Sequence, residues 1–413
     1  MRKLSKKGIA AGVLALLVIY VAGAFFLVNF CDISDFNFPW IVYMLEHGAL
    51  HMYDEWVINY PPIFPLWLDL IGGAAVKALE SVPFVFQFLM KSFSVLVNAA
   101  AAVFMWKKLS PEAALAWLAN LALFVNVSVW GQTDAAFGFL ILLFFYYMKA
   151  DSPLFVTAVF VVMCLLKVQG AYFIFPLLVY LFSRRAVRQA LGCLFAGGAV
   201  GYAAYLPFII TAGDWLLPIK VYLNALSCYI SAFSRNAQNV WFVLNKWAVP
   251  EWLSSFSVIV VLLSAALLVF VFRRTGNVCT GTLCYMFSVF MFSFDQHERY
   301  ILYTEVILFV LVFLFGEEQF RTQYRLVTMT AFLSQVAVLA VFSLWYQRPF
   351  PEYTILIKAV CGAICYACVI INLWQYVSMW KILFGRIGKT SPLKAQTKRY
   401  CRDLSSGNRR KKD

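Results

Sequence analysis

Apolar runs follow one another along almost the whole chain, and most are long enough to cross a lipid bilayer. A transmembrane helix needs about 20 consecutive, predominantly apolar residues. The 413 residues are 63% hydrophobic and 13% charged, whereas about 25% of the residues in a soluble globular protein are charged. These features exclude a soluble enzyme, a disordered chain and a disulfide-rich secreted domain. They predict an all-α polytopic membrane protein.

Basic residues cluster between the apolar runs and at both ends of the chain, and they set the predicted topology. The formal net charge is +14, and most Lys and Arg lie in the two tails and in five short connections. The positive-inside rule makes these segments cytoplasmic, so we expect attraction to anionic lipid and no nucleic-acid binding. The chain then crosses the membrane about twelve times, with both ends inside. The predicted spans are 8–28, 83–106, 113–128, 135–148, 154–166, 171–182, 190–210, 254–272, 280–294, 300–315, 326–345 and 353–380.

The domain organisation follows from this threading. Within the first outer loop, the apolar segment 61–79 would either cross the membrane or lie along its surface. The second choice keeps Lys107 and Lys108 inside, so we predict juxtamembrane helices in this loop. The predicted parts are a basic N-terminal tail (1–7), one transmembrane catalytic unit (8–380) with outer loops at 29–82 and 211–253, and a basic C-terminal tail (381–413).

Polar motifs stand at the ends of the predicted spans, and the threading places them all on the outer side. An ionised group at the bilayer centre costs at least ~2.5–3.5 kcal/mol, and a position at a helix end avoids much of that cost. A cleft with acids, Arg, Lys and His beside lipid-facing helices suits an amphiphilic substrate with a phosphate head and a long apolar tail. The motifs are Asp32 and Asp35 in DISDFNFPW, NYPP at 59–62, WGQTD at 130–134, KVQG at 167–170, NAQNVW at 236–241 and HERY at 297–300.

Together these motifs resemble the bacterial relatives of the GPI-anchor second mannosyltransferase, within the GT-C class of integral-membrane glycosyltransferases. The resemblance runs from about Asp32 to Tyr300 and rests on the order, spacing and shared sidedness of the motifs. It implies a GT-C-like fold and a polyprenyl-phosphate-linked donor. Mannose or another hexose would pass, with inversion, to a glycolipid, polysaccharide or protein acceptor on the extracytoplasmic face. Short loops favour a bacterial cytoplasmic membrane, with the ER membrane as the alternative.

The resemblance also implies that an acid in the first outer loop is the catalytic base. Asp32 fits best, because the pattern D-I-x-x-F matches the family's motif, which is followed by a tryptophan. Trp40 comes one residue late, with Pro39 inserted, so Asp35 remains an alternative base. Asp134 matches the second-loop acid of the class and is the third predicted catalytic residue, which together with Gln132 would fix the acceptor or orient the donor-binding group. Asp295 and Gln296 stand where the family usually has a basic residue and Met before HER.

The charges that develop during glycosyl transfer assign roles to these residues. A carboxylate takes the proton of the acceptor hydroxyl as general base, and cations hold the leaving phosphate, for which Arg offers a planar fork and Lys a point charge. We expect Arg299, Lys167 and His297 to bind the donor phosphate. No metal is invoked, although Asp32 and Asp134 could meet in space and bind one. The predicted substrate-binding residues are Tyr60, Trp130, Gln132, Gln169, Asn236, Asn239 and Glu298.

Two rival interpretations remain. A transporter or flippase for a lipid-linked saccharide would use a similar basic cleft without breaking a bond, and it would carry polar residues through the membrane midplane. A structural subunit of a membrane complex would need no catalytic acid. The clustering of polar motifs at outer helix ends favours the enzyme.

Overall fold

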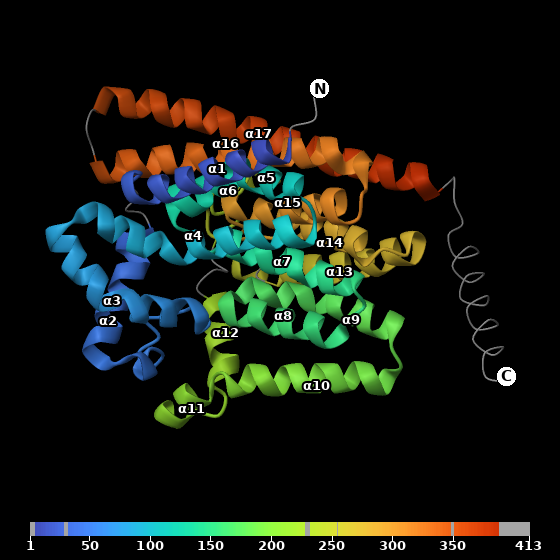
Figure 1. Ribbon diagram of the computed structural model, residues 1–413, viewed down its shortest axis with the longest axis horizontal. Coiled ribbons are helices and arrows are strands. Elements are labelled where there is room, and N and C mark those ends of the chain that lie inside the picture. The colour runs from blue at the N-terminus through green and yellow to red at the C-terminus, as the bar shows by residue number, and fades with distance from the viewer. Residues whose placement is uncertain (1–4, 29–31, 228–231, 254, 348–350, 388–413) are drawn as a thin grey trace.

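The computed structural model describes residues 5–28, 32–227, 232–253, 255–347 and 351–387 (Figure 1). Most of the predicted C-terminal tail, and residues 1–4 of the N-terminal tail, lie outside these residues. The described part is 83% helical and has no strands, which confirms the all-α prediction. The α-helices are α1 Lys6–Phe26, α2 Phe38–His47, α3 Ile63–Ser81, α4 Pro83–Lys108, α5 Pro111–Leu118, α6 Leu121–Phe124, α7 Asp134–Lys149, α8 Pro153–Leu166, α9 Ile174–Arg184, α10 Val187–Ala203, α11 Leu206–Ala212, α12 Leu217–Ser227, α13 Phe256–Thr275, α14 Val278–Phe292, α15 Ile301–Phe309, α16 Arg321–Gln347 and α17 Pro351–Ile387.

Several of these helices are suited to a membrane. Five are long and apolar enough to cross it, and two bent pairs, α5 with the segment 121–130 and α10 with α11, raise the number to seven. The chain is therefore a membrane-embedded protein. Every predicted span coincides with one helix or with consecutive helices. The total of about twelve crossings and the GT-C fold remain predictions.

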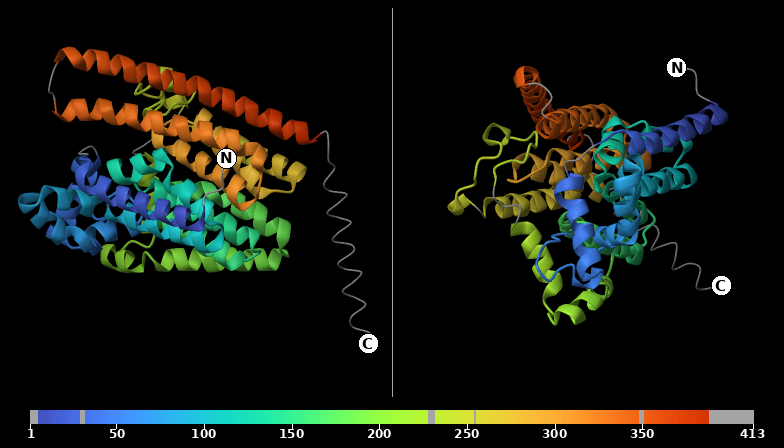
Figure 2. Two further views of the ribbon diagram at one scale, coloured as in Figure 1. Left: turned by 45° about the horizontal axis from the view of Figure 1, so that its top comes forward. Right: turned by 90° about the vertical axis from the view of Figure 1, so that its left-hand side faces the viewer.

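The connections between helices gather at two opposite ends of the bundle. Side chains from the connections at 130–134, 167–170 and 297–300 contact one another, whereas Lys149, Arg184, Asn277 and Phe315 surround a separate cavity of about 290 Å³. The helices α2 and α3 lie at the left-hand end of the bundle in Figure 1. The long helices α16 and α17 pack side by side along one edge (Figure 2).

Local sequence signals explain why the third predicted span is broken. Ser110 accepts a hydrogen bond from the Ala113 N–H and Pro111 takes the first helical position, so α5 starts with a capped end. Asn120 then caps a second start, because its side-chain oxygen accepts the N–H groups of Ala122 and Leu123. The two pieces meet at 57°. The segment continues through a π-helical turn, Val125–Trp130. Trp130 therefore lies at the end of the bundle where the connections at 130–134, 167–170 and 297–300 meet.

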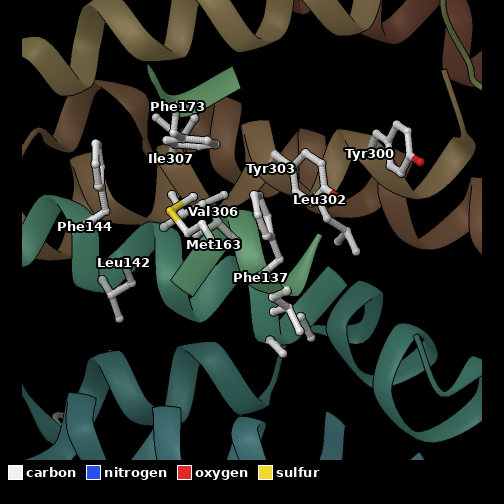
Figure 3. Close-up of a cluster of buried hydrophobic side chains, with 14 of the residues drawn as sticks. Phe137, Leu142, Phe144, Met163, Phe173, Tyr300, Leu302, Tyr303, Val306 and Ile307 are labelled. Atoms are coloured by element: carbon white, nitrogen blue, oxygen red, sulfur yellow. The ribbon is translucent and has the colours of Figure 1, made fainter. Parts of the chain in front are cut away.

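The core is built around α15, whose residues are all buried. Figure 3 shows its Val306 and Ile307 among Phe137 and Phe144 of α7, Met163 of α8 and Phe173. The rings of Phe137 and Tyr303 lie 4.9 Å apart. Because α15 directly follows the HERY motif, this packing fixes the motif against α7 and α8.

Polar residues also lie inside the bundle, and here the sequence argument was incomplete. Glu305 is fully buried within α15, where Asn120 donates a hydrogen bond to it and Thr328 donates another over 2.7 Å. Lys91 is fully buried in α4 and donates to the Leu27 carbonyl. From the sequence alone, all ionisable groups were expected at helix ends. A buried Glu305 could not be foreseen, because the side chains that bond to it belong to other helical segments. Buried ionisable residues inside the bundle are also expected of a transporter, so Glu305 and Lys91 do not favour the enzyme over it.

The Gly170 position of the KVQG motif has no room for a side chain, which gives a testable expectation. A Cβ there would stand 2.5 Å from the Cys164 backbone nitrogen, whereas at Gly192 in α10 it would meet nothing within 4 Å. We expect Gly170→Ala to destabilise the protein by about 1–3 kcal/mol through overpacking. Gly192→Ala should be neutral or slightly stabilising. Thermal unfolding in detergent checks both, and equal midpoints would contradict the packing described for this turn.

Candidate active site

A cavity of about 460 Å³ lies where α2, the 130–133 turn, the 232–248 loop and the 297–299 segment meet. Its size falls within the range of about 300–1,000 Å³ that is usual for ligand pockets. The four segments are far apart in sequence, so the fold brings these predicted motifs into one place. The predicted residues that line the cavity are Asp32, Asp35, Tyr60, Trp130, Gln132, Asn236, His297, Glu298 and Arg299.

Asp32 is held by the turn that precedes α7. Its Oδ2 accepts a hydrogen bond from Trp130 Nε1 over 2.8 Å and another from Gln132 Nε2. The turn itself is fixed from behind, because Ser94 of α4 donates to the Gln132 carbonyl over 2.6 Å. Asp32 is half-buried, while Asp35 is exposed at the cavity wall. The two candidate bases therefore differ in how far they are buried.

The extra residue before Trp40 is accommodated by the backbone. Residues Ile33–Asn37 form a π-helical turn, in which the Phe38 N–H donates to the Ile33 carbonyl. A π turn holds one residue more than an α turn, and such turns are frequent at functional sites. Trp40 consequently lines the cavity together with Asp32, with its ring 5.5 Å from that of Tyr60.

Arg299 is the most enclosed cation of the cavity. Its Nε lies 3.4 Å from Asp134 Oδ2 and its Nη1 lies 3.2 Å from Glu298 Oε1, and the guanidinium stands 5.4 Å from the Trp130 ring centre. Burial lowers the pKa of Arg299, but the charges of Asp32, Glu298 and Asp134 together hold that pKa well above its usual range. The Arg299 side chain is only 11% exposed. A permanent positive charge is thus fixed at the cavity wall.

Asp134 and Lys167 lie behind the cavity instead of lining it. Both side chains are fully buried, with Lys167 Nζ 2.5 Å from Asp134 Oδ1, and Tyr303 donates to the same oxygen over 2.5 Å. The cavity lining includes neither Lys167, which was predicted to bind the donor phosphate, nor Asp134, which was predicted to fix the acceptor or to orient the donor-binding group. Instead, Asp134 is shared between two cations, because its second oxygen faces Arg299.

Gln169 and Asn239 are also outside the lining. Gln169 donates to the Tyr300 hydroxyl over 2.8 Å, and Asn239 donates to the Phe290 carbonyl over 3.1 Å while accepting the Trp241 N–H. Both are buried amides whose hydrogen bonds hold the cavity segments together. Their sequence motifs lie next to the cavity, but those motifs do not distinguish a residue that lines a cavity from one that shapes the loop.

Two neighbours of Arg299 have shifted pKa values. Burial raises the pKa of the Glu298 carboxyl to about 7, an effect that Arg299 opposes. Burial, with the nearby charges of Arg299 and Arg235, holds the pKa of His297 well below its usual range. His297 is therefore neutral near pH 7, so any contact it makes with a phosphate is a hydrogen bond and not an ion pair.

Sequence reasoning missed several residues of the lining, above all Arg235 and Lys246. Arg235 directly precedes the NAQNVW motif, and its Nε lies 2.6 Å from Asp295 Oδ1. This ion pair accounts for the acid at position 295, since its charge is balanced by a neighbouring loop. The pair could have been predicted from the sequence, because Arg235 precedes the NAQNVW motif and the opposite charge, Asp295, stands two residues before the HERY motif. The other polar residues missed are Asn37, Asn59 and Thr133.

No group of three or more His, Cys, Asp or Glu that could hold a metal ion occurs in the part of the chain that the structure describes. Comparison with known protein families and with curated proteins gives no match to this chain. The chemistry of the site therefore has to be argued from its own residues.

Proposed function

We propose that this protein is an inverting glycosyltransferase that moves a hexose, such as mannose, from a polyprenyl-phosphate donor to an acceptor on the extracytoplasmic face of a membrane. One observation carries the proposal: a half-buried carboxylate, Asp32, and an almost fully buried cation, Arg299, line the same cavity at the end of an apolar helical bundle. Trp130 contacts both of them. The resemblance of the motifs to GT-C enzymes points the same way.

Asp32 is the proposed general base. The acceptor hydroxyl gives its proton to the Asp32 carboxylate while its oxygen forms a bond to the anomeric carbon of the sugar. Such a base typically contributes ~10²–10⁴-fold to the rate. The hydrogen bonds that Trp130 and Gln132 donate to its Oδ2 fix the position of the carboxylate at the cavity wall.

Arg299 is the proposed anchor of the leaving group. As the bond between the anomeric carbon and the phosphate oxygen breaks, the electron pair stays with the polyprenyl phosphate, which gains negative charge. A guanidinium can pair with two phosphate oxygens. Asp134 holds Arg299 in place before the substrate arrives, so little reorganisation is needed during the reaction. In this proposal Lys167 acts indirectly, by fixing Asp134.

In this proposal the lipid tail of the donor lies beside α3. This helix starts just after Tyr60, which lines the cavity, and buries Phe64 and Leu68 against its neighbours. Its other side leaves Leu66 and Leu70 exposed, at 41% and 75%. A helix that is apolar on both sides next to a polar cavity suits an amphiphile that places its head in the cavity and its chain in lipid.

The proposal is tested by incubating the purified protein, in vesicles, with polyprenyl phospho-mannose and a crude lipid acceptor extract. Release of polyprenyl phosphate that requires both the protein and the extract supports a transferase. Transfer of intact donor across the vesicle membrane, with no release of polyprenyl phosphate, would instead support the flippase.

Glu298 leads to a specific pH dependence. A sugar phosphodiester keeps one negative charge between pH 6 and 8, but Glu298, with its pKa of about 7, loses its charge as the pH falls through that range. Because the carboxylate competes with the donor for Arg299 at 3.2 Å, we expect the KM for donor to fall several-fold from pH 8 to pH 6. In Glu298→Gln the KM should be low at both pH values. A wild-type KM that rises toward acid pH, or a variant that keeps the wild-type profile, would contradict this role.

A further inference from the structure

The 232–248 loop supplies two cations to the cavity that the proposed reaction does not use. Arg235 and Lys246 both line it. Arg299 alone holds the donor phosphate in the proposed function, and Lys167 lies outside the lining. The loop therefore adds basic groups to a site that already contains a phosphate anchor.

The loop is a rigid platform whose backbone fixes both cations. The Phe233 N–H donates to the Trp247 carbonyl and the Lys246 N–H to the Ser234 carbonyl, each over 3.0 Å. The Arg235 N–H donates to the Gln296 carbonyl over 3.0 Å, which ties the loop to the segment that carries Arg299. The Lys246 N–H and the carbonyl of the next residue, Trp247, are thus both held, and the Lys246 side chain starts from a defined position.

The backbone of the 232–248 loop is strained at Asn236 and at Lys246. Asn236 and Lys246 adopt φ values of 63° and 64°, a left-handed conformation that is unfavourable for Lys. The Asn236 and Asn245 side chains bond to each other over 2.9 Å, and Asn245 Oδ1 also accepts the Asn236 N–H. Strain of this kind persists where the surroundings over-determine the conformation, and it is concentrated at functional sites.

The two cations have different surroundings. Arg235 is oriented by Asp295, which balances its charge. Lys246 is exposed, has its Nζ 5.8 Å from the Phe342 ring centre, and makes no ion pair with any carboxylate among the residues that the structure describes. A positive charge that no described carboxylate balances therefore stands at the wall of the cavity that Arg235, held by Asp295, also lines.

We propose that Arg235 and Lys246 form a second anion subsite, which binds a phosphate or carboxylate group of the substrate separate from the phosphate on Arg299. The proposed subsite depends on the proposed function in one respect, which is that the donor phosphate is assigned to Arg299. The acceptor is the source we favour, so the acceptor carries an acidic group. A second phosphate on a diphosphate-linked donor is the other source of the same chemistry.

The test uses the purified full chain in detergent and needs no turnover. The protein is first saturated with farnesyl phosphate, to occupy Arg299, and inorganic phosphate is then titrated while thermal unfolding is followed. We expect a further saturable rise in the unfolding midpoint for the wild type and for Lys246→Arg. This rise should be lost in Lys246→Gln and kept in Lys107→Gln, which removes an exposed lysine at the end of α4. No further rise in the wild type, or an equal rise in Lys246→Gln, overturns the subsite.

Repeating the titration with farnesyl diphosphate identifies the source of the second anion. If the diphosphate removes the later response to inorganic phosphate, the donor fills the subsite; if the response remains, the acceptor does. Farnesyl phosphate that fails to stabilise the protein would count against the proposed function. The inorganic phosphate titration, done without it, still decides the subsite.

Discussion

Asp32→Asn should lower the rate of polyprenyl phosphate release by about 10²–10⁴-fold, because the amide cannot take the proton of the acceptor hydroxyl. The amide can still occupy the place of the carboxylate beside Trp130 Nε1, so we expect donor binding and the unfolding midpoint to change little. The measurement is initial release from polyprenyl phospho-mannose at matched protein levels.

Asp35→Asn is the matched control. Asp35 lies three residues further on, at the wall of the same cavity, but it is exposed, whereas Asp32 is half-buried. We expect this variant to retain most of the activity. If instead Asp35→Asn abolishes release and Asp32→Asn does not, the roles are reversed and the hydrogen bonds to Asp32 only shape the loop.

Asp134→Asn should cause the largest loss of stability. The substitution leaves Lys167 and Arg299 buried without the carboxylate that balances them. Removing one partner of a buried ion pair costs about 3–5 kcal/mol, mostly because the other charge stays buried. Denaturant or thermal unfolding of the purified variant measures the change, and we expect low yields of folded protein.

A second variant separates charge balance from lost packing. Adding Lys167→Met to Asp134→Asn removes one of the two cations that are left buried without their carboxylate. The double variant should therefore regain part of the stability that Asp134→Asn loses. The exposed pair of Asp214 and Lys220, with its atoms 2.7 Å apart, is the control, since exposed pairs contribute little. If Asp214→Asn destabilises the protein as much as Asp134→Asn does, or if Lys167→Met makes the loss larger, the account of the buried cluster is wrong.

The helical elements could be predicted well from the sequence. The length of an apolar run, and the Pro, Asn and basic residues that bound it, are local signals. Thus α3 was expected at 61–79 and occupies Ile63–Ser81. The π-helical turn at Ile33–Asn37 was not predicted, since the DISDF run has no local feature that separates it from an α-helix. The bend at Asn120 was missed because a single polar residue barely changes the hydropathy of the run, although its side chain caps a new helix start.

The site could be predicted as a set of motifs but not as a set of contacts. Side chains as alike in sequence as Lys167 and Lys246 end up in opposite situations, one fully buried on Asp134 and the other exposed at the cavity wall. Which of them faces a ligand depends on contacts with other segments, such as that of Lys167 with Asp134, 33 residues away, and that of Lys246 with Phe342. Such long-range pairing is absent from local patterns, and this explains why Arg235 and Lys246 were overlooked.

The measurement that tests the central claim most directly is the product formed by the purified protein from a donor of known anomeric configuration. We predict one polyprenyl phosphate released for each sugar transferred, with the sugar attached to the acceptor in the opposite anomeric configuration, as nuclear magnetic resonance of the product would show. Retained configuration, or free sugar released at the same rate without acceptor, would contradict direct displacement with Asp32 as the base.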